Sequence, residues 1–266
     1  MSTLSLITVE QPQLINAIDT IWVAICGAII FFMEGGFALL EAGFVRSKNA
    51  MSIIAKVIID VTFGGIAFYI IGFGIAYGNS NGWFAFDTGI TTKDLGLGLT
   101  VSNKLFWFIQ LGFAIAAISI VSGAVAERIK IWPFFAFAVV MSGVIYPISM
   151  GWQWGGGWLS TSGFSDFAGS TLVHACGGAA ALAGVIVLGA REGRFTSSGG
   201  KRVMVPFAAS SIPLVTLGTF LLWFGWFGFN GFSQLAMGTF DDVNAISKIA
   251  VNTHLAGAAG TVTGAA

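Results

Sequence analysis

The sequence predicts an all-α membrane protein, a polytopic bundle of helices, and two observations carry that prediction. First, 56 % of the 266 residues are hydrophobic and only 9 % are charged, whereas roughly a quarter of the residues in soluble domains are charged. Second, apolar segments recur at about the 20-residue length that a helix needs to cross a bilayer. These segments are too long for barrel strands, and open sheets do not survive in lipid.

Seven such segments follow one another without a soluble domain between them. They cover residues 21–44, 53–77, 105–125, 132–150, 167–190, 205–229 and 245–266. The seventh is still apolar where the sequence stops at Ala266. We therefore expect a single membrane domain over residues 1–266, truncated in its seventh transmembrane helix.

The ends of several segments carry helix punctuation. Pro133 falls in a first turn, where its missing N–H is harmless. Asp166 precedes the fifth segment as an N-cap whose carboxylate would accept from the amides two and three residues on. Gly193 follows that segment as a predicted C′ residue. Pairs such as Gly35 and Gly36 allow close helix packing in a membrane.

Loop charges alternate along the chain and predict its orientation. Basic residues follow the first, third and fifth segments at Arg46, Lys48, Arg128, Lys130, Arg191, Arg194, Lys201 and Arg202, and the opposite loops hold only Lys93 and Lys104. The positive-inside rule puts the basic loops in the cytoplasm and the N-terminus outside. We expect a multi-pass protein of the plasma (cell inner) membrane.

Three further interpretations concern charges inside the segments. Lys56 and Asp60 are spaced i, i+4 and are expected to pair with each other. Glu41 is expected to pair with Arg46 at the inner end. With Glu34, these charges are interpreted as packing devices rather than as a site.

The predicted orientation brings five residues to the outer membrane face: Phe113, Trp154, Asp166, Phe229 and Ser233. An indole face attracts cations, and a hydroxyl can accept a hydrogen bond from one. Each residue also has an ordinary reading: interfacial tryptophan, packing phenylalanine, helix cap or loop serine.

An ionisable group inside the bilayer is functional by default, and His174 is such a group. It follows Asp166 by eight residues, which places it about 12 Å deeper along a helix rising 1.5 Å per residue. The alternative is a histidine satisfied by helix packing. With the outer residues, His174 suggests a site for a small cation that loses a proton on entering an apolar path.

Five stretches resemble the ammonium transporter, methylammonium permease and Rhesus family. They are Gly-Gly-Phe-Ala-Leu-Leu-Glu-Ala-Gly-Phe-Val-Arg-Ser-Lys-Asn at residues 35–49, Gly-Ala-Val-Ala-Glu-Arg at 123–128, Trp-Gly-Gly-Gly at 154–157, Asp-Phe-Ala-Gly-Ser-Thr-Leu-Val-His at 166–174 and Trp-Phe-Gly-Trp-Phe-Gly-Phe-Asn at 223–230. Their order and spacing agree along almost the whole chain.

The resemblance implies a homotrimer of eleven-helix subunits, each with its own pore and built from two inverted repeats. This chain resembles the first repeat and the start of the second. The resemblance also implies ammonium recruitment by Phe113, Trp154 and Ser233, and a gate of two stacked rings, Phe113 and Phe229. It implies site support from Asp166.

In the family, the residue matching His174 is the first of two pore histidines. The second belongs to a helix beyond Ala266. His254 lies on the wrong helix to be this partner, and we interpret it as a packing residue.

The implied function is ammonium transport, with ammonia passing His174. The alternatives are the membrane domain of an ammonium sensor in a signalling fusion, or an inactive fragment. The implied partners are ammonium or ammonia, the bilayer and a cytoplasmic regulatory protein. No nucleic acid, cofactor or metal is expected. The sequence shows no catalytic triad, metal-ligand spacing or phosphate loop, so we do not expect an enzyme.

Overall fold

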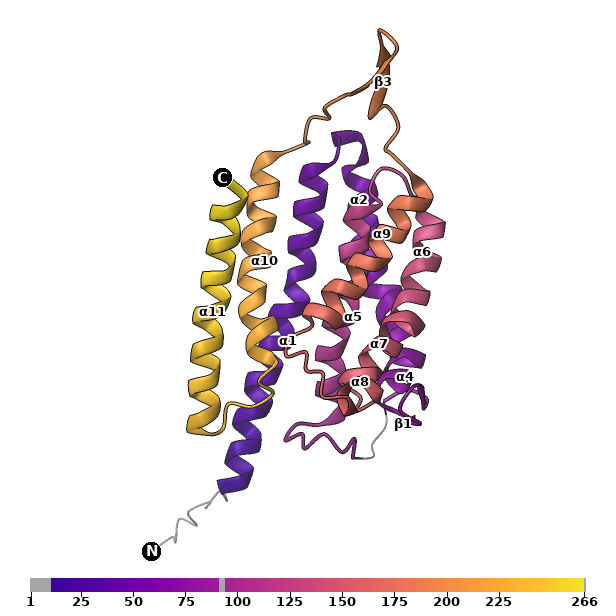
Figure 1. Cartoon of the computed structure of the whole chain (residues 1–266). Coiled ribbons are helices and arrows are strands. Elements are labelled where there is room, and N and C mark those ends of the chain that lie inside the picture. Colours follow the sequence, from indigo (N-terminus) through magenta and orange to yellow (C-terminus); the bar gives the residue numbers. More distant parts are fainter. Residues whose placement is uncertain (1–10, 91–93, 266) are drawn as a thin grey trace, which may run out of the picture.

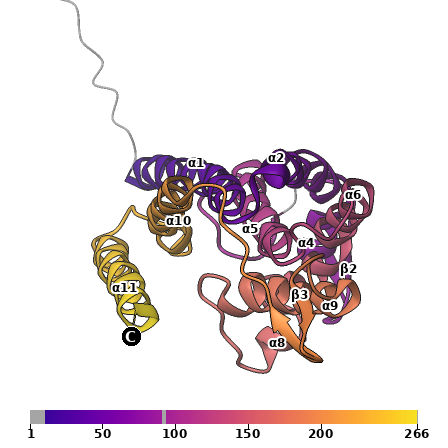
Figure 2. The ribbon, with the colours of Figure 1, turned by 90° about the horizontal axis from the view of Figure 1, so that it is seen from above.

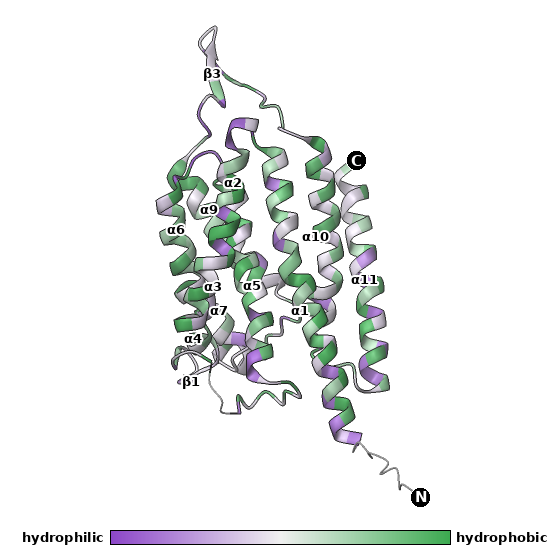
Figure 3. Cartoon of the chain, turned by 180° about the vertical axis from the view of Figure 1, so that it is seen from behind, coloured by the Kyte–Doolittle hydropathy of each residue, from purple (hydrophilic) through white to green (hydrophobic). Residues whose placement is uncertain are grey.

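The computed structural model describes residues 11–90 and 94–265, so Lys93 and Ala266 lie outside the described residues. The fold is a bundle of long, roughly parallel and antiparallel helices (Figure 1), as predicted. Hydrophobic residues dominate along the lengths of these helices (Figure 3). Within the described residues, six helical segments are long and apolar enough to cross a membrane.

The first three crossings are largely where the sequence predicts them. The first is α1 (Gln11–Phe44). The second is a continuous run of η1 (Ser47–Asn49), α2 (Ala50–Ile59), η2 (Asp60–Gly64), α3 (Gly65–Ala67), η3 (Phe68–Gly72) and α4 (Phe73–Tyr77). The third is α5 (Asn103–Ala124), which lies near the centre of the bundle when it is viewed along the helices (Figure 2).

The later crossings complete the bundle. The fourth is formed by α6 (Ile131–Val140), η4 (Met141–Ile145) and α7 (Tyr146–Gln153), followed by the short α8 (Trp158–Thr161). The fifth is formed by η5 (Ser170–Ala175) and α9 (Cys176–Leu188), and the sixth is α10 (Ile212–Phe232). The predicted seventh segment is the helix α11 (Phe240–Ala265), which packs against α10 but is not among the six apolar crossings.

Several predicted helix ends are wrong. The first segment begins at Gln11 instead of residue 21, and the seventh begins at Phe240 instead of residue 245. The fifth segment ends at Leu188, and Gly189, with φ +69°, is its C-cap instead of Gly193. The sixth segment begins at Ile212 instead of residue 205, because Ser211 caps it by accepting from the Leu214 amide. The residues before it form an antiparallel hairpin of β3 (Phe195–Ser198) and β4 (Lys201–Met204). A second small pair, β1 (Asn79–Ser80) and β2 (Ala85–Phe86), lies at the other end of the bundle (Figure 1).

The most extensive helix contact is between α1 and α10, and glycine makes it possible. A Cβ added to Gly218 would lie 2.4 Å from the Leu40 amide nitrogen, and one added to Gly43 would lie 2.7 Å from the Val215 nitrogen. Only the absence of a side chain lets the two backbones approach so closely.

Both predicted ion pairs are wrong. Lys56 donates to the Ser122 carbonyl, at 2.9 Å, instead of pairing with Asp60. Arg46 pairs with Glu127, at 3.1 Å, instead of with Glu41. The predicted pairs were chosen from residues close together in the sequence. A buried polar group needs a hydrogen-bond partner, and the structure supplies these partners from residues far away in the sequence.

Glu127 forms hydrogen bonds and ion pairs with residues from the other two predicted cytoplasmic loops. Its Oε1 atom accepts from the Arg46 amide and side chain and from Asn49, and its Oε2 atom accepts from Arg191 at 3.3 Å. Residues that follow the first, third and fifth crossings therefore meet at one end, as the alternating loop charges require.

Candidate functional site

Four aromatic side chains from four helical segments form an unbroken row. Trp154 at the end of α7 lies 5.4 Å from Phe113 of α5, measured between ring centroids. Phe113 lies 4.2 Å from Phe229 of α10. Phe229 lies 5.8 Å from the imidazole of His174 in η5. The structure thus brings together these four residues that the sequence singled out.

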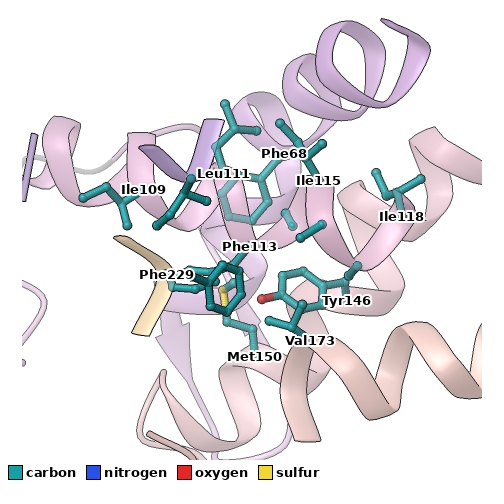
Figure 4. Packing of buried hydrophobic residues seen from close by; sticks show 14 of the residues in the cluster. Phe68, Ile109, Leu111, Phe113, Ile115, Ile118, Tyr146, Met150, Val173 and Phe229 are labelled. Carbon is teal, nitrogen blue, oxygen red and sulfur yellow. The ribbon is translucent and has the colours of Figure 1, made fainter. Parts of the chain in front are cut away.

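The two phenylalanines fill the middle of the row and are almost completely buried, with 1 % and 0 % of their surface exposed. Figure 4 shows Phe113 and Phe229 side by side, with Tyr146, Met150 and Val173 around them. Their rings meet at 86°, edge to face, instead of in the stacked arrangement that the family resemblance implied. Edge-to-face contact pairs a positive ring edge with a negative ring face.

A cavity of about 160 Å³ lies at the Trp154 end of the row. It is lined by Tyr77, Leu97, Leu99, Phe106, Gln110, Phe113, Trp154, Phe167, Phe232, Ser233 and Leu235. All three predicted recruitment residues therefore border one space. The walls are mostly aromatic, with few polar atoms, which suits a small cation.

Ser233 is positioned as an acceptor toward this cavity. It is the C-cap of α10, and its hydroxyl donates to the Phe229 carbonyl at 3.1 Å. A hydroxyl has one hydrogen and two lone pairs. Because the hydrogen is engaged within the helix, the oxygen remains available to accept from a ligand.

Gln110 is a lining residue that the sequence reasoning missed. Its side chain is only 4 % exposed, and its Oε1 atom has no hydrogen-bond partner among the described residues. A buried, unsatisfied acceptor calls for a ligand or water. The signal was present, since Gln110 is a polar residue in an apolar segment, three residues before Phe113.

Asp166 contacts Trp154 and is not among the residues that line the cavity. Its carboxylate accepts from the amides of residues 169, 170, 171 and 172 at 2.8–3.1 Å. Its carbonyl accepts from the Trp154 indole at 2.7 Å, which fixes that ring. The predicted N-cap is wrong, since Gly169 holds that position, but the Asp166 carboxylate still satisfies amides at the start of η5, three to six residues on instead of two and three.

The fifth crossing begins at Ser170 instead of the predicted residue 167. Gly169 has φ +95°, a left-handed conformation, and the helix begins only at Ser170. The helical rise therefore applies only from Ser170 onward and does not set the depth of His174 below Asp166.

His174 borders a second cavity, of about 340 Å³, between η5, α10 and α11. Its lining is Ala168, Ser170, His174, Trp223, Trp226, Asn230, Thr253, Ala256 and Gly257. His254 does not line it and stacks on Trp223 at 5.5 Å, as a packing residue would. Among residues 11–90 and 94–265, no group of three His, Cys, Asp or Glu side chains is arranged to hold a metal ion.

Comparison with known proteins gives a consistent result. Residues 21–266 match the model of the Ammonium Transporter Family. The chain is 42 % identical to ammonium transporter Amt2 of Archaeoglobus fulgidus, over 96 % of this chain and 54 % of that protein. It is 39 % identical to a putative ammonium transporter of Synechocystis, over 95 % of this chain and 57 % of that protein.

Solved structures agree in fold. One described as a "Sensor Amt Protein" superposes with a TM-score of 0.78 at 38 % identity, covering 84 % of this chain and 56 % of that one. Mep2 of Saccharomyces cerevisiae gives 0.74 at 26 % identity, with 86 % and 51 % covered. The chain thus spans about half the length of the relatives it matches.

Proposed function

This chain belongs to the ammonium transporter family, and on that premise we propose that it recruits ammonium and conducts ammonia across a membrane. The observation that carries the proposal is the unbroken row from Trp154 through Phe113 and Phe229 to His174. The row leads from a mostly aromatic cavity with a few polar groups, past the buried Phe113 and Phe229 rings, to a histidine.

Recruitment is assigned to the cavity beside Trp154. Ammonium there would lie against the π faces of Trp154 and Phe113, an attraction of roughly 0.5–2 kcal/mol. The free oxygens of Ser233 and Gln110 would accept from its N–H groups. Asp166 holds the indole in place through the bond to its carbonyl.

The aromatic pair acts as the gate. Moving an unpaired ion between Phe113 and Phe229 would remove its hydration without replacement, which is far costlier than moving a neutral molecule. Ammonium would therefore lose its proton before the gate, and ammonia would pass. Neutral imidazole offers one donor and one acceptor, so His174 would hydrogen-bond ammonia beyond the gate.

We extend the proposal to the whole protein as the family and the loop charges support it. The protein would be a homotrimer in the plasma membrane, with the N-terminus outside and the basic loops facing the cytoplasm. Those loops would offer the contact surface for a cytoplasmic regulatory protein.

The test is methylammonium uptake into proteoliposomes that contain the protein. We expect Trp154→Leu to raise the apparent KM by about 2- to 30-fold, the equivalent of one cation–π contact, and His174→Ala to lower the maximal rate. The matched controls are Trp132→Leu, at a 75 % exposed tryptophan, and His254→Ala. Unchanged uptake in both test variants would refute the mechanism, and ammonium binding without uptake would indicate the sensor alternative.

A further inference from the structure

Four ionisable side chains are buried between the first three crossings, away from the aromatic row. They are Glu34 and Glu41 of α1, Lys56 of α2 and Asp60 of η2, and none is more than 7 % exposed. Ser119, where they meet α5, is six residues beyond Phe113, about 120° around that helix at 100° per residue. The cluster therefore lies on a different face of α5 from the proposed ammonium path.

Charge balance in this cluster requires a bound proton. Three carboxyl groups face a single cation within the cluster, Lys56. With every group ionised the sum would be two negative charges. Uncompensated charge in a buried setting is strongly unfavourable, and protonation of a carboxyl group reduces it.

Hydrogen bonding locates that proton beside Ser119. The Ser119 hydroxyl oxygen lies 2.7 Å from Glu34 Oε2 and 3.2 Å from Asp60 Oδ2. A hydroxyl has a single hydrogen and can donate to only one of them. The other carboxyl group satisfies the contact only by donating to the serine oxygen, so it must itself be protonated.

Asp60 supplies an independent indication of a missing ligand. Its side chain is 0 % exposed, and within the part of the chain that the structure describes its Oδ1 atom has no hydrogen-bond partner. A buried carboxylate oxygen left in this way is unfavourable if it carries charge. Asp60 also opens the π-helical turn η2, a distortion frequent at functional sites.

Glu41 connects the cluster to one end of the bundle. It accepts from the Ser122 hydroxyl at 2.8 Å, and the carbonyl of the same serine accepts from Lys56 at 2.9 Å. Glu41 also borders a cavity of about 650 Å³ that it shares with Arg128, Arg191 and Arg194. Charged groups thus extend from the basic-loop end to Asp60, one helical turn beyond Lys56.

We propose that Glu34, Ser119 and Asp60 form a buried proton-binding site, with Glu41 and Lys56 linking it to the basic-loop end. In one transfer, the Glu34 O–H bond breaks as its proton moves to the Ser119 oxygen. The proton originally on Ser119 moves to Asp60 Oδ2 in the same step. The serine is unchanged, and one proton has moved from Glu34 to Asp60. The site is independent of the proposed ammonium path.

Infrared spectroscopy of the purified protein at neutral pH tests the site, without added ammonium. We expect the carbonyl stretch of a protonated carboxylic acid, shifted in D₂O, and its loss in the isosteric double variant Glu34→Gln/Asp60→Asn. The matched control is Asp94→Asn/Glu192→Gln, at two exposed residues, which should leave the band unchanged. Absence of the band from the wild type, or its survival in the test variant, would overturn the proposal.

A second variant keeps the test decisive if the double variant does not fold. Ser119→Ala removes one hydroxyl and leaves both carboxyl groups. We expect the band to persist but its hydrogen–deuterium exchange to slow by about tenfold, as expected for the loss of one bridging hydrogen bond. Exchange at the wild-type rate would refute the role of Ser119. Because uptake is not measured, failure here and failure of the transport proposal are separate results.

Discussion

Replacing Glu127 with glutamine should loosen the basic-loop end of the bundle. Glu127 lies in the turn between α5 and α6, and its side chain is 0 % exposed. It accepts from Arg46 and Asn49 at 2.8–3.1 Å and from Arg191 at 3.3 Å. Glu127→Gln keeps the shape but removes the charge and one of the two acceptor oxygens.

The magnitude follows from the pKa of Glu127. Burial alone would raise this pKa, but the hydrogen bonds from Arg46 and Asn49 lower it from 4.5 to about 2. A depression of that size corresponds to roughly 3 kcal/mol of stability. Since the two arginines are 28 % and 32 % exposed, solvent screening reduces the expected loss to about 1–3 kcal/mol.

The pH dependence has a definite sign. Because the folded-state pKa is depressed, the contribution is fully present above pH 4.5, the ordinary value, and is lost as the pH falls toward 2. Wild-type protein in detergent should therefore lose stability across that interval. Glu127→Gln should lack that part of the acid loss, because it has no proton to bind.

Thermal unfolding in detergent measures both effects. At neutral pH we expect the Tm of Glu127→Gln to fall by about 2–4 °C per kcal/mol lost, the scale for chains of this size. The control is Glu192→Gln, at an exposed glutamate in the loop after α9, which should leave the Tm within error. An unchanged Tm for Glu127→Gln would contradict the reasoning, as would an acid response identical to that of the wild type.

Two other substitutions test the contact between α1 and α10 and the hydrogen bonds of the Asp166 carboxylate. Gly218→Ala should destabilise the protein by about 1–3 kcal/mol, since its new methyl group would meet the Leu40 backbone at 2.4 Å; Gly35→Ala, with no atom within 4 Å, is the control in the same thermal assay. Asp166→Asn keeps one acceptor oxygen for four amides, so we expect lower methylammonium uptake and a lower Tm, whereas Asp94→Asn should change neither.

The helices were predictable because their signal is local. Segment length, apolar composition and proline position can each be read from one continuous stretch of sequence. Six of the predicted segments correspond to helices that are long and apolar enough to cross a membrane. The hairpin of β3 and β4 was missed because residues 191–204 were read only as a basic loop, and residues 205–211 were read as the start of the next helix. Pro206 and Ser211 in fact separate the two elements.

Partners across the bundle were not predictable, because they lie far apart in the sequence. Glu127 and Arg46 are 81 residues apart, and Glu34 and Ser119 are 85 apart. Reasoning from i, i+4 spacing could offer only neighbours on the same helix. The contacts that satisfy buried charges depend on which helices pack together, and that information is tertiary.

The candidate site falls between these two cases. Trp154, Asp166 and His174 stand out in the sequence by residue type and place. Phe113 and Phe229 do not, since the chain has 25 phenylalanines, and only the family resemblance selected them. Gln110 went unnoticed because a lone amide in an apolar helix is usually satisfied by packing partners, and its unpaired oxygen is visible only in three dimensions.

The central helix α5 explains how the proposed ammonium path and the proposed proton-binding site can coexist in so small a bundle. Between Leu105 and Ala124 it carries no charged residue, and its polar side chains are neutral amide or hydroxyl groups. Burying such a group is far less costly than burying a charge, so the most enclosed helix can serve both sides. Gln110 and Phe113 line the cavity beside Trp154, while Ser119 and Ser122 contact the carboxyl groups contributed by α1 and η2. Ser119→Ala should therefore alter proton exchange in the buried cluster and leave the affinity for methylammonium at the cavity unchanged.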